Sequence, residues 1–296
     1  MRDLPIAALD IGGTTLKAAL PQAGGPMRRV EAPTRAAEGA DRVLERAADL
    51  LRSLAPFAAL GVSTAGMVDP ISGIMGYAND NIPGYTGTDV KGFFARRFGV
   101  PTAVVNDANA AALGEGALGA AADCPDFFCV VYGTGIGAGL VLDGTLRLGA
   151  GGAAGEAGAL IVHPEDIVPG DPFSGCYERY ASASALVAAA RAMDPSIRDG
   201  RAVFARLEEP PVAALVDRWL DEVAHGLCSL IHLLQPRRVV LGGGIMEQPY
   251  AVEGARRRVL ARLIPVFRPV SIVGARLGNM AALYGAARLA GDLLAP

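Results

Sequence analysis

The feature that most constrains the fold is a strand, glycine turn, strand pattern that occurs once in each half of the chain. Residues 6–20 read as an apolar strand ending in Asp10, a turn containing a glycine pair, and a second strand. In the second half, the apolar strand 127–132 is followed by Gly-Thr-Gly-Ile-Gly-Ala-Gly at 133–139 and by another strand at 140–145. Strands joined in this way form hairpins. The repeated layout predicts a duplicated α/β architecture that grips one polyphosphate.

Each glycine turn taken alone is equally compatible with a plain hairpin. The functional interpretation is that backbone N–H groups and threonine hydroxyls of the turn face phosphate, with Asp10 reaching a hydrated Mg²⁺. Glycine-rich runs after a strand also occur in dinucleotide-binding folds, but there the run opens a helix. Residues 133–139 are followed by a strand. This order argues against a dehydrogenase.

A second junction that indicates function lies at Asn106-Asp107. The β-branched run 102–105 predicts a buried strand, and the alanine-rich residues after Asp107 predict a helix. Asn and Asp are good N-cap residues, which is the structural interpretation. The functional interpretation is that Asp107 lies at the carboxyl end of a strand and the N-terminus of a helix. Open α/β sheets bind ligands there, and the helix dipole keeps an Asp ionised.

The rest of the chain alternates between strand and helix patterns. Near the end of the chain, Gly242-Gly243-Gly244 permits close approach of a flat ligand, or a sharp crossover. His225 and His232 share one helix face and are expected to be core or interface residues, and Lys17 a surface residue. The turn-rich stretch 78–85 is expected to connect elements or to line a site for hydroxyl groups. Helices are expected at 40–54, 88–98 and 212–234, and buried strands at 58–63 and 239–241.

Composition excludes several classes of protein. The chain has 296 residues, of which 51% are hydrophobic and 19% charged, so two folded domains are expected and disorder is not. The net charge of −3 and the lack of a basic run argue against nucleic acid as a partner. No apolar run reaches transmembrane length, no signal segment precedes the first strand, and the four cysteines lack framework spacing. A reduced cytoplasmic enzyme is expected.

Seven motifs in register resemble those of the ROK sugar kinases, from about residue 5 to residue 290. They are Asp-Ile-Gly-Gly-Thr-Thr (10–15), Asn-Ile-Pro-Gly-Tyr (81–85), Asn-Asp-Ala-Asn-Ala-Ala-Ala-Leu-Gly-Glu (106–115), Tyr-Gly-Thr-Gly-Ile-Gly-Ala-Gly (132–139), Ala-Gly-Glu-Ala-Gly (154–158), Gly-Cys-Tyr-Glu (175–178) and Leu-Gly-Gly-Gly-Ile (241–245). The resemblance implies two RNase-H-like α/β domains of the actin-like ATPase fold with a cleft between them. It implies a small domain at 1–115, completed by a C-terminal helix at about 281–294, and a large domain at 116–280.

The resemblance also implies the reaction and the residues that carry it. The reaction is ATP-dependent phosphorylation of a hexose hydroxyl, usually the 6-hydroxyl, with Asp107 as general base. An Asp with an ordinary pKa is a mediocre base at pH 7, although a loose transition state tolerates late proton removal. The implied sugar ligands are Asn81, Asn106, Asp107, Glu156 and Glu178, with Gly66 contributing its backbone. The implied nucleotide residues are Asp10 near Mg²⁺, Gly12, Gly13, Thr14, Thr134 and Gly135 at the phosphates, and Gly243 and Gly244 at the adenosine.

The chain departs from the ROK pattern around the sugar. Many members have a His at the position of Ala159. That His touches the sugar and, together with cysteines of a following segment, ligates a structural zinc. Here only Cys176 of those cysteines remains and His163 is displaced by four positions. Because structural zinc sites need four Cys or His ligands, no zinc site is predicted. Loss of the His forfeits about 1–3 kcal/mol of polar contact and enlarges the sugar site, which predicts tolerance of a bulkier C1 or C2 substituent.

Several alternatives remain open at this stage. The specific activity could be that of a β-glucoside kinase or an N-acetylmannosamine kinase, and the phosphate donor could be ATP or polyphosphate. A catalytically inactive sugar-binding regulator is a second class. A ROK-like repressor would need a DNA-binding helix-turn-helix before the first strand, and that strand begins by about residue 5. A homodimer is expected from the resemblance.

Overall fold

The computed structural model describes residues 5–22 and 25–294, and its contacts divide the chain into two compact units. Unit 1 comprises residues 1–118, 146–154 and 280–296, and unit 2 comprises residues 119–145 and 155–279. The expected lack of a signal segment concerns residues 1–4, which lie outside the described residues. Across the described residues, no helix combines the length and apolar character that a membrane span requires.

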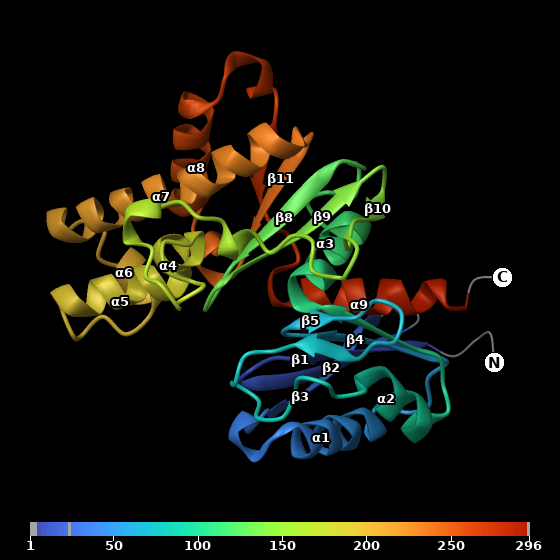
Figure 1. Cartoon of the computed structure of the whole chain (residues 1–296). Helices are drawn as coiled ribbons and strands as arrows, with labels where there is room; N and C mark the ends of the chain where they lie inside the picture. Colours follow the sequence, from blue (N-terminus) through green and yellow to red (C-terminus); the bar gives the residue numbers. More distant parts are fainter. Residues whose placement is uncertain (1–4, 23–24, 295–296) are drawn as a thin grey trace. The chain divides into compact units, whose positions relative to one another are not determined.

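Unit 1 contains a five-stranded mixed sheet with the order β3-β2-β1-β4-β7 (Figure 1). Strands β1, β2 and β3 are antiparallel neighbours, whereas β4 pairs parallel with both β1 and β7. A short hairpin, β5–β6, follows β4. The strands are β1 Ile6–Ile11, β2 Thr15–Gln22, β3 Gly25–Pro33, β4 Ala59–Thr64, β5 Met67–Val68, β6 Met75–Tyr77 and β7 Thr102–Asn106. The helices are α1 Ala40–Arg52, α2 Val90–Phe98, α3 Asp107–Leu118 and α9 Ala281–Asp292, with a 3₁₀ turn at Ala36–Glu38.

The two faces of this sheet are covered differently. Alternate residues of β1, among them Leu9, pack with α1 and α2 in the larger apolar core of the unit. The opposite face presents Ala8 and Ala19 to Leu283 and Ala286 of α9. Figure 1 shows α1 and α2 on one side of the sheet and α9 on the other. The small side chains allow α9 to approach the sheet at backbone distance.

Unit 2 repeats the sheet topology, with the order β10-β9-β8-β11-β12. As in unit 1, the first hairpin, β8–β9, is antiparallel, and β11 pairs parallel with β8 and with β12. The strands are β8 Phe127–Tyr132, β9 Ile136–Leu142, β10 Thr145–Leu146, β11 Arg238–Gly242 and β12 Ser271–Gly274. The helices are α4 Tyr177–Ala181, α5 Ala183–Met193, α6 Gly200–Phe204, α7 Pro210–Leu234 and α8 Pro249–Arg262. The predicted duplicated α/β architecture is confirmed.

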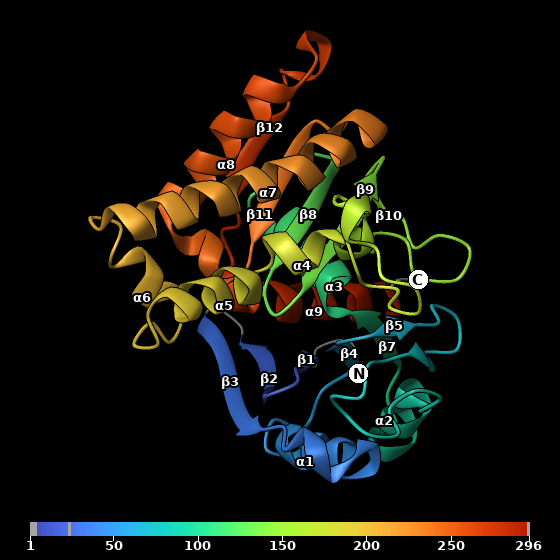
Figure 2. The same ribbon diagram turned by 60° about the vertical axis from the view of Figure 1, so that its left-hand side comes forward.

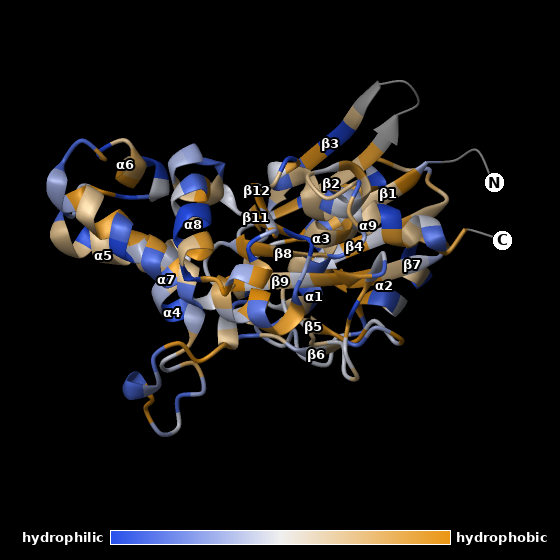
Figure 3. Ribbon diagram, turned by 90° about the horizontal axis from the view of Figure 1, so that it is seen from above, coloured by the Kyte–Doolittle hydropathy of each residue, from blue (hydrophilic) through white to orange (hydrophobic). Residues whose placement is uncertain are grey.

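The core of unit 2 lies between its sheet and the long helix α7. Phe128, Val130 and Tyr132 of β8 are buried in one cluster with Trp219 and Leu227 of α7. Figure 2 shows α7 and α8 passing over the strands of this sheet, and in Figure 3 β8 has the colour of hydrophobic residues. Short 3₁₀ turns join the elements at Ala157–Ala159, Pro164–Asp166, Gly244–Glu247, Pro265–Phe267 and Gly278–Met280.

Several expected element bounds need correction. The second hairpin turns within residues 133–135 and β9 begins at Ile136, because Gly137 and Gly139 lie in the strand opposite Val131 and Cys129. The helix expected from residue 88 begins at Val90, since the Asp89 carboxylate accepts the Gly92 N–H at 2.7 Å and caps it.

Of the two alternatives predicted for His225, core or interface, the structure excludes the first. Its side chain is 42% exposed and bonded to Glu222, so it is not a core residue. His232 is half-buried and packs edge-on against Phe267.

Candidate active site

Asp107 is the first residue of α3, directly after β7. The residue that caps this helix is Asn106, whose Oδ1 accepts the N–H groups of Ala108 at 2.9 Å and Asn109 at 3.2 Å. The Asn106 Nδ2 donates to Oδ1 of Asp107 at 3.1 Å. Asn106 and Asp107 therefore have different roles. Asn106 ends the strand and orients its neighbour, and Asp107 presents a carboxylate at the helix N-terminus.

The electrostatic surroundings of Asp107 suit a base. Its hydrogen bonds from Ala108 and Asn106 engage Oδ1, and no described residue donates to Oδ2. Desolvation, with a smaller contribution from the negative charge of Asp10, raises the pKa of Asp107 to about 6. Asp107 is nevertheless exposed to solvent. Protein atoms surround the carboxyl group closely enough to disfavour its charge, while solvent or a ligand still reaches it. The sequence-based expectation of an ordinary pKa was therefore wrong.

Asp10 lies near the end of β1 with a polar partner on each side. Ser63 of β4 donates to its Oδ1 at 2.9 Å, and Nζ of Lys17 on β2 lies 3.7 Å from its Oδ2. Burial raises the pKa of Asp10, whereas Lys17 and Ser63 oppose the rise. The Lys17 side chain is 23% exposed. Its assignment as a surface residue was wrong, because Lys17 is half-buried and forms an ion pair with Asp10.

Gly66 supplies a backbone carbonyl close to this carboxylate pair. Its φ is +97°, and a Cβ there would lie 2.8 Å from the Tyr77 carbonyl oxygen, so a side chain is excluded. The Gly66 carbonyl accepts the Asn106 Nδ2 at 3.1 Å. With this bond, both oxygen acceptor positions and both N–H donors of the Asn106 amide are engaged within unit 1. A sugar hydroxyl that binds Asn106 must replace or share one of these bonds.

The β1–β2 turn is held by its own backbone and by Thr34. The Gly12 N–H donates to the Thr15 carbonyl at 3.2 Å, and the Thr34 hydroxyl donates to the Gly12 carbonyl at 2.6 Å. Gly13 and Thr14 are exposed, and a Cβ added at Gly13 would meet nothing within 4 Å. Hydrogen bonds at Gly12 thus fix the base of the turn, while its tip is open to solvent.

Asn81 lies in the loop between β6 and α2, and its side chain is exposed. Ile82 and Tyr85 of the same loop are buried, and the Tyr85 hydroxyl is hydrogen-bonded to Thr64 at 2.8 Å. This anchors the loop to the end of β4. Unit 1 therefore carries eight of the predicted positions, three of them in the β1–β2 turn: Asp10, Gly12, Gly13, Thr14, Gly66, Asn81, Asn106 and Asp107.

In unit 2, the predicted residues Gly135 and Glu178 are in direct contact. The Ile136 N–H donates to Oε2 of Glu178 at 3.2 Å. A Cβ on Gly135 would lie 2.4 Å from that oxygen, and one on Gly158 2.8 Å from it. The carboxylate thus occupies the space that two glycines leave beside the β8–β9 turn. The buried Tyr177 positions it, because its hydroxyl donates to the Val223 carbonyl of α7 at 2.7 Å.

The two glycines after β11 differ from each other. Gly243 has φ +96°, and a Cβ there would lie 2.1 Å from the Tyr132 carbonyl oxygen at the end of β8. Only glycine therefore allows the β11 end to meet the start of the 133–135 turn. Gly244 faces open space, and Thr134 is exposed at the tip of its turn. Glu156 is exposed in the segment that precedes the 3₁₀ turn Ala157–Ala159.

Comparison with known proteins gives a consistent result. The model of the ROK family matches residues 6–292. The chain belongs to the ROK family. It is similar to a β-glucoside kinase of Listeria innocua, at 31% identity over 83% of this chain and 84% of the relative. Two solved structures are also similar. A ROK hexokinase of Thermus thermophilus has 32% identity and a TM-score of 0.81 over 98% of this chain and 99% of the other. A ROK glucokinase of Streptomyces griseus in complex with glucose and AMPPNP has 28% identity and a TM-score of 0.85 over 97% and 99%.

The segment that departs from the ROK pattern adopts a defined structure in unit 2. Ala159 is exposed, and Cys176 is buried with its thiol pKa raised by that burial. An isolated β-bridge joins Ile161 to Cys176 and closes the intervening loop. His163 lies inside this loop and is hydrogen-bonded to Glu165 and Glu222.

Sequence reasoning missed Lys17 and Ser63 as partners of Asp10. A signal for Lys17 was present. In a tight hairpin the residues equidistant from the turn lie opposite each other, and Asp10 pairs with Lys17 in the register of β1 and β2. Ser63 had no comparable signal, because its contact depends on the parallel pairing of β1 with β4. These two residues, which lie outside the ROK motifs, contact the Asp10 carboxylate and hold it in place.

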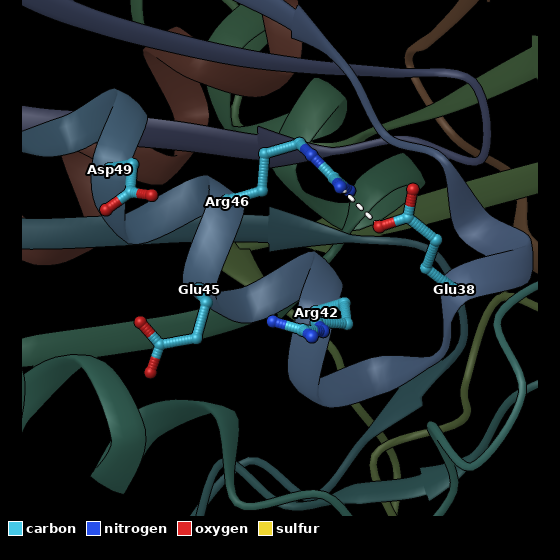
Figure 4. Close-up of a pocket in the computed structure, with 5 residues that line it drawn as sticks. All are labelled: Glu38, Arg42, Glu45, Arg46 and Asp49. Carbon is cyan, nitrogen blue, oxygen red and sulfur yellow. Dashed lines mark hydrogen bonds and ion pairs between the residues drawn. The ribbon is translucent and has the colours of Figure 1, made fainter.

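Charged side chains also gather on the exposed face of α1. Figure 4 shows Arg42, Glu45, Arg46 and Asp49 along this helix, with Arg46 paired to Glu38. The set holds three acidic and two basic side chains, and none of the ROK motif residues belongs to it. Ion pairs of this kind are typical of a solvated helix face.

Proposed function

We propose that this ROK-family protein is an ATP-dependent carbohydrate kinase that phosphorylates a hydroxyl, the 6-hydroxyl, of a hexose or hexose derivative. The observation that carries the proposal is Asp107. It combines a carboxylate oxygen without a described partner, a pKa of about 6, and a place at the start of α3. A general base works best when its pKa approaches the working pH. The similarity to hexokinase and glucokinase structures supports the same reaction class.

In the proposed mechanism, Oδ2 of Asp107 accepts the proton of the attacking hydroxyl. Phosphoryl transfer passes through a loose transition state, so orientation of the nucleophile matters as much as early proton removal. Asn106 and Ala108 both donate to Oδ1 of Asp107, which leaves Oδ2 available for the hydroxyl proton. The γ-phosphoryl group of ATP is transferred to the hydroxyl oxygen, and ADP is released as the second product.

The residues present fit a nucleotide with Mg²⁺. Mg²⁺ in phosphoryl-transfer sites is held by one or two carboxylates together with substrate phosphates and water, and it neutralises developing charge. Asp10 offers such a carboxylate, held by Ser63 and Lys17. Gly12, Gly13 and Thr14 in unit 1, and Thr134 and Gly135 in unit 2, offer backbone N–H groups and hydroxyls for phosphate. Gly243 and Gly244 would leave room for the adenosine.

Sugar recognition is assigned to polar groups around these turns. Asn81, Glu156 and Glu178 would bind hydroxyl groups directly, Gly66 through its backbone, and Asn106 by sharing its present bonds. The Ile136 N–H already orients the Glu178 carboxylate. A homodimer is also proposed from the family resemblance, and light scattering in solution tests it.

Ala159 leads us to propose that the sugar site accepts a substituent at C1 or C2. A similar relative is a β-glucoside kinase, which agrees with that substrate class. In a coupled ADP-release assay over glucose, mannose, fructose, N-acetylhexosamines and cellobiose, activity is expected to extend beyond free glucose. Ala159→His should narrow the range and lower kcat/KM for the substituted sugars about tenfold or more, because the ring fills the space of the substituent. Activity restricted to glucose in both proteins would contradict the wider site.

The pH dependence of kcat/KM tests Asp107 as the base. Because kcat/KM reports ionisation in the free enzyme, its acid limb is expected to have a midpoint near pH 6 rather than near pH 4. Asp107 is protonated below the midpoint, so activity should fall about tenfold per pH unit there. Circular dichroism across the same pH range excludes unfolding as the cause. A flat profile down to pH 4.5 would remove the base assignment.

A non-catalytic sugar-binding regulator is the second candidate. It would bind sugar without sugar-dependent release of ADP, which the same assay measures. Asp107 favours the enzyme, because binding alone does not require an unpartnered carboxylate oxygen with a raised pKa.

A further inference from the structure

Unit 2 contains a group of metal-ligand side chains that the proposed reaction does not use. The group comprises His163, Glu222 and His225, and one ligand atom from each lies within 4.8 Å of the other two. Glu222 and His225 are three residues apart on α7 and therefore share a helix face. His163 reaches them from the loop that the Ile161–Cys176 bridge closes.

The distances in this group approach those of a coordination sphere. Nε2 of His163 lies 2.9 Å from Oε2 of Glu222, and Nδ1 of His225 lies 3.2 Å from the same oxygen. Ligand atoms bound tetrahedrally to Zn²⁺ at about 2.0–2.2 Å lie about 3.3–3.6 Å from one another. Small side-chain movements would bring the three atoms to that spacing. Two histidines and one carboxylate leave a fourth position for water.

A second observation concerns the other nitrogen of His163. Nδ1 is hydrogen-bonded to Oε1 of Glu165 at 2.9 Å, so Nε2 is the nitrogen that points into the group. Metal-bound histidines commonly donate their second N–H to a carboxylate, which fixes the tautomer and the ring orientation. The His163 ring also packs on Tyr180 with centroids 4.1 Å apart, and the Tyr180 hydroxyl donates to Asp166. The ring is therefore oriented before any ion binds.

We propose that His163 Nε2, Glu222 Oε2 and His225 Nδ1 bind one divalent transition-metal ion of the Zn²⁺ type, with Glu165 as the partner of His163. The ion would replace the protons that these groups share in the metal-free chain. It would cross-link the loop before α4 to α7 and so support the helix that carries Glu178. The site uses no cysteine, and it differs from the cysteine-containing zinc site absent from this sequence. It does not depend on the proposed kinase activity.

The test uses the tag-free full chain with Zn²⁺ as the probe. After incubation and gel filtration, elemental analysis is expected to find about one retained equivalent, and Zn²⁺ should raise Tm reversibly with chelator. His163→Gln and His225→Gln should weaken binding more than a hundredfold, and Glu165→Gln about 10–100-fold. His232→Gln on the same helix is the matched control and should bind as wild type. Circular dichroism establishes that each variant is folded, and the exposed His225 keeps the test informative if His163→Gln unfolds.

Substitution by Co²⁺ identifies the ligands independently of stability. Nitrogen and oxygen ligation predicts visible ligand-field bands without a thiolate-to-metal charge-transfer band. The proposal is overturned by no retained zinc, by binding that the histidine variants leave unchanged, or by a thiolate band. The proposal would also be overturned if His163→Gln lowered Tm by the same amount with and without Zn²⁺. The group would then stabilise the protein only through its ion pairs and hydrogen bonds.

Discussion

Asp107→Asn is expected to lower kcat by about 10²–10⁴-fold while leaving the protein folded. Asparagine keeps an oxygen that can accept the hydrogen bonds now made by Ala108 and Asn106, but its amide cannot take a proton from a hydroxyl. The loss should appear in kcat more than in KM, because the proton is transferred in the transition state. Steady-state kinetics with the best sugar of the panel measures it.

The same substitution should stabilise the protein at neutral pH. A carboxyl group whose pKa is raised to about 6 in the folded state binds its proton more tightly there than in the unfolded chain. The charged form of Asp107 therefore lowers the free energy of unfolding, and this destabilisation is complete above pH 6. It disappears as the pH falls below 3.8, the ordinary pKa of an Asp. The Tm of Asp107→Asn should exceed that of wild type at pH 7, and the difference should shrink as pH falls through 6 and vanish below pH 3.8.

Asp41→Asn is the matched control, since Asp41 is an exposed acidic residue in the first turn of α1 in the same unit. It should leave kcat unchanged. Turnover of Asp107→Asn within threefold of wild type would exclude Asp107 as the base. A Tm below that of wild type at pH 7 would contradict the electrostatic cost.

Gly285→Ala is expected to destabilise unit 1 by about 3 kcal/mol and to lower its Tm by about 5–10 °C. A Cβ at Gly285 would lie 1.7 Å from the Ala110 carbonyl oxygen of α3, so the two helix backbones must separate. Gly114 makes the reciprocal approach, where a Cβ would lie 2.1 Å from the Ala281 carbonyl oxygen. Backbone atoms cannot rotate away as a side-chain tip can. Calorimetry or thermal circular dichroism measures the change.

Gly291→Ala on the same helix provides the comparison. Its Cβ would lie 3.3 Å from the Cδ1 atom of Ile6, which is the end of a flexible side chain. Alanine also favours the helix by about 1 kcal/mol over glycine, so Gly291→Ala should change stability by less than about 1 kcal/mol. Equal stability of the two variants would show that α9 does not pack on α3 at backbone distance.

The repeated topology was predictable because its signals are local. Apolar runs bounded by glycine turns determine both hairpins, and the strand-to-helix change at Asn106-Asp107 follows from β-branched residues giving way to alanines. Other elements were not predicted. Strand β3, the hairpin β5–β6 and helices α4 to α6 and α8 depend on tertiary contacts more than on periodicity.

The site was predictable in residue type but not in its electrostatics. The raised pKa of Asp107 results mainly from desolvation in the folded unit, with a smaller contribution from Asp10, which lies 97 positions earlier in the chain. Both causes depend on the tertiary structure. Asn106 was expected to bind sugar. Its roles as helix cap and as hydrogen-bond donor to the Gly66 carbonyl depend on contacts that the sequence does not show. The membership of residues 146–154 in unit 1 had no sequence signal either. The roles of the site residues in catalysis stay predictions until the variants are measured.

The position of α9 near the end of the chain determines the order in which the two units can fold during synthesis. Residues 281–292 cover a sheet face formed by strands that leave the ribosome more than 170 residues earlier. Until synthesis reaches α9, Ala8 and Ala19 lack their cover, and the grooves at Gly61 and Gly114 stay unfilled. Unit 2 is complete by residue 279. Co-translational folding should therefore finish the second unit before the first, and nascent chains stalled before residue 281 should expose the first sheet to chaperones or proteases.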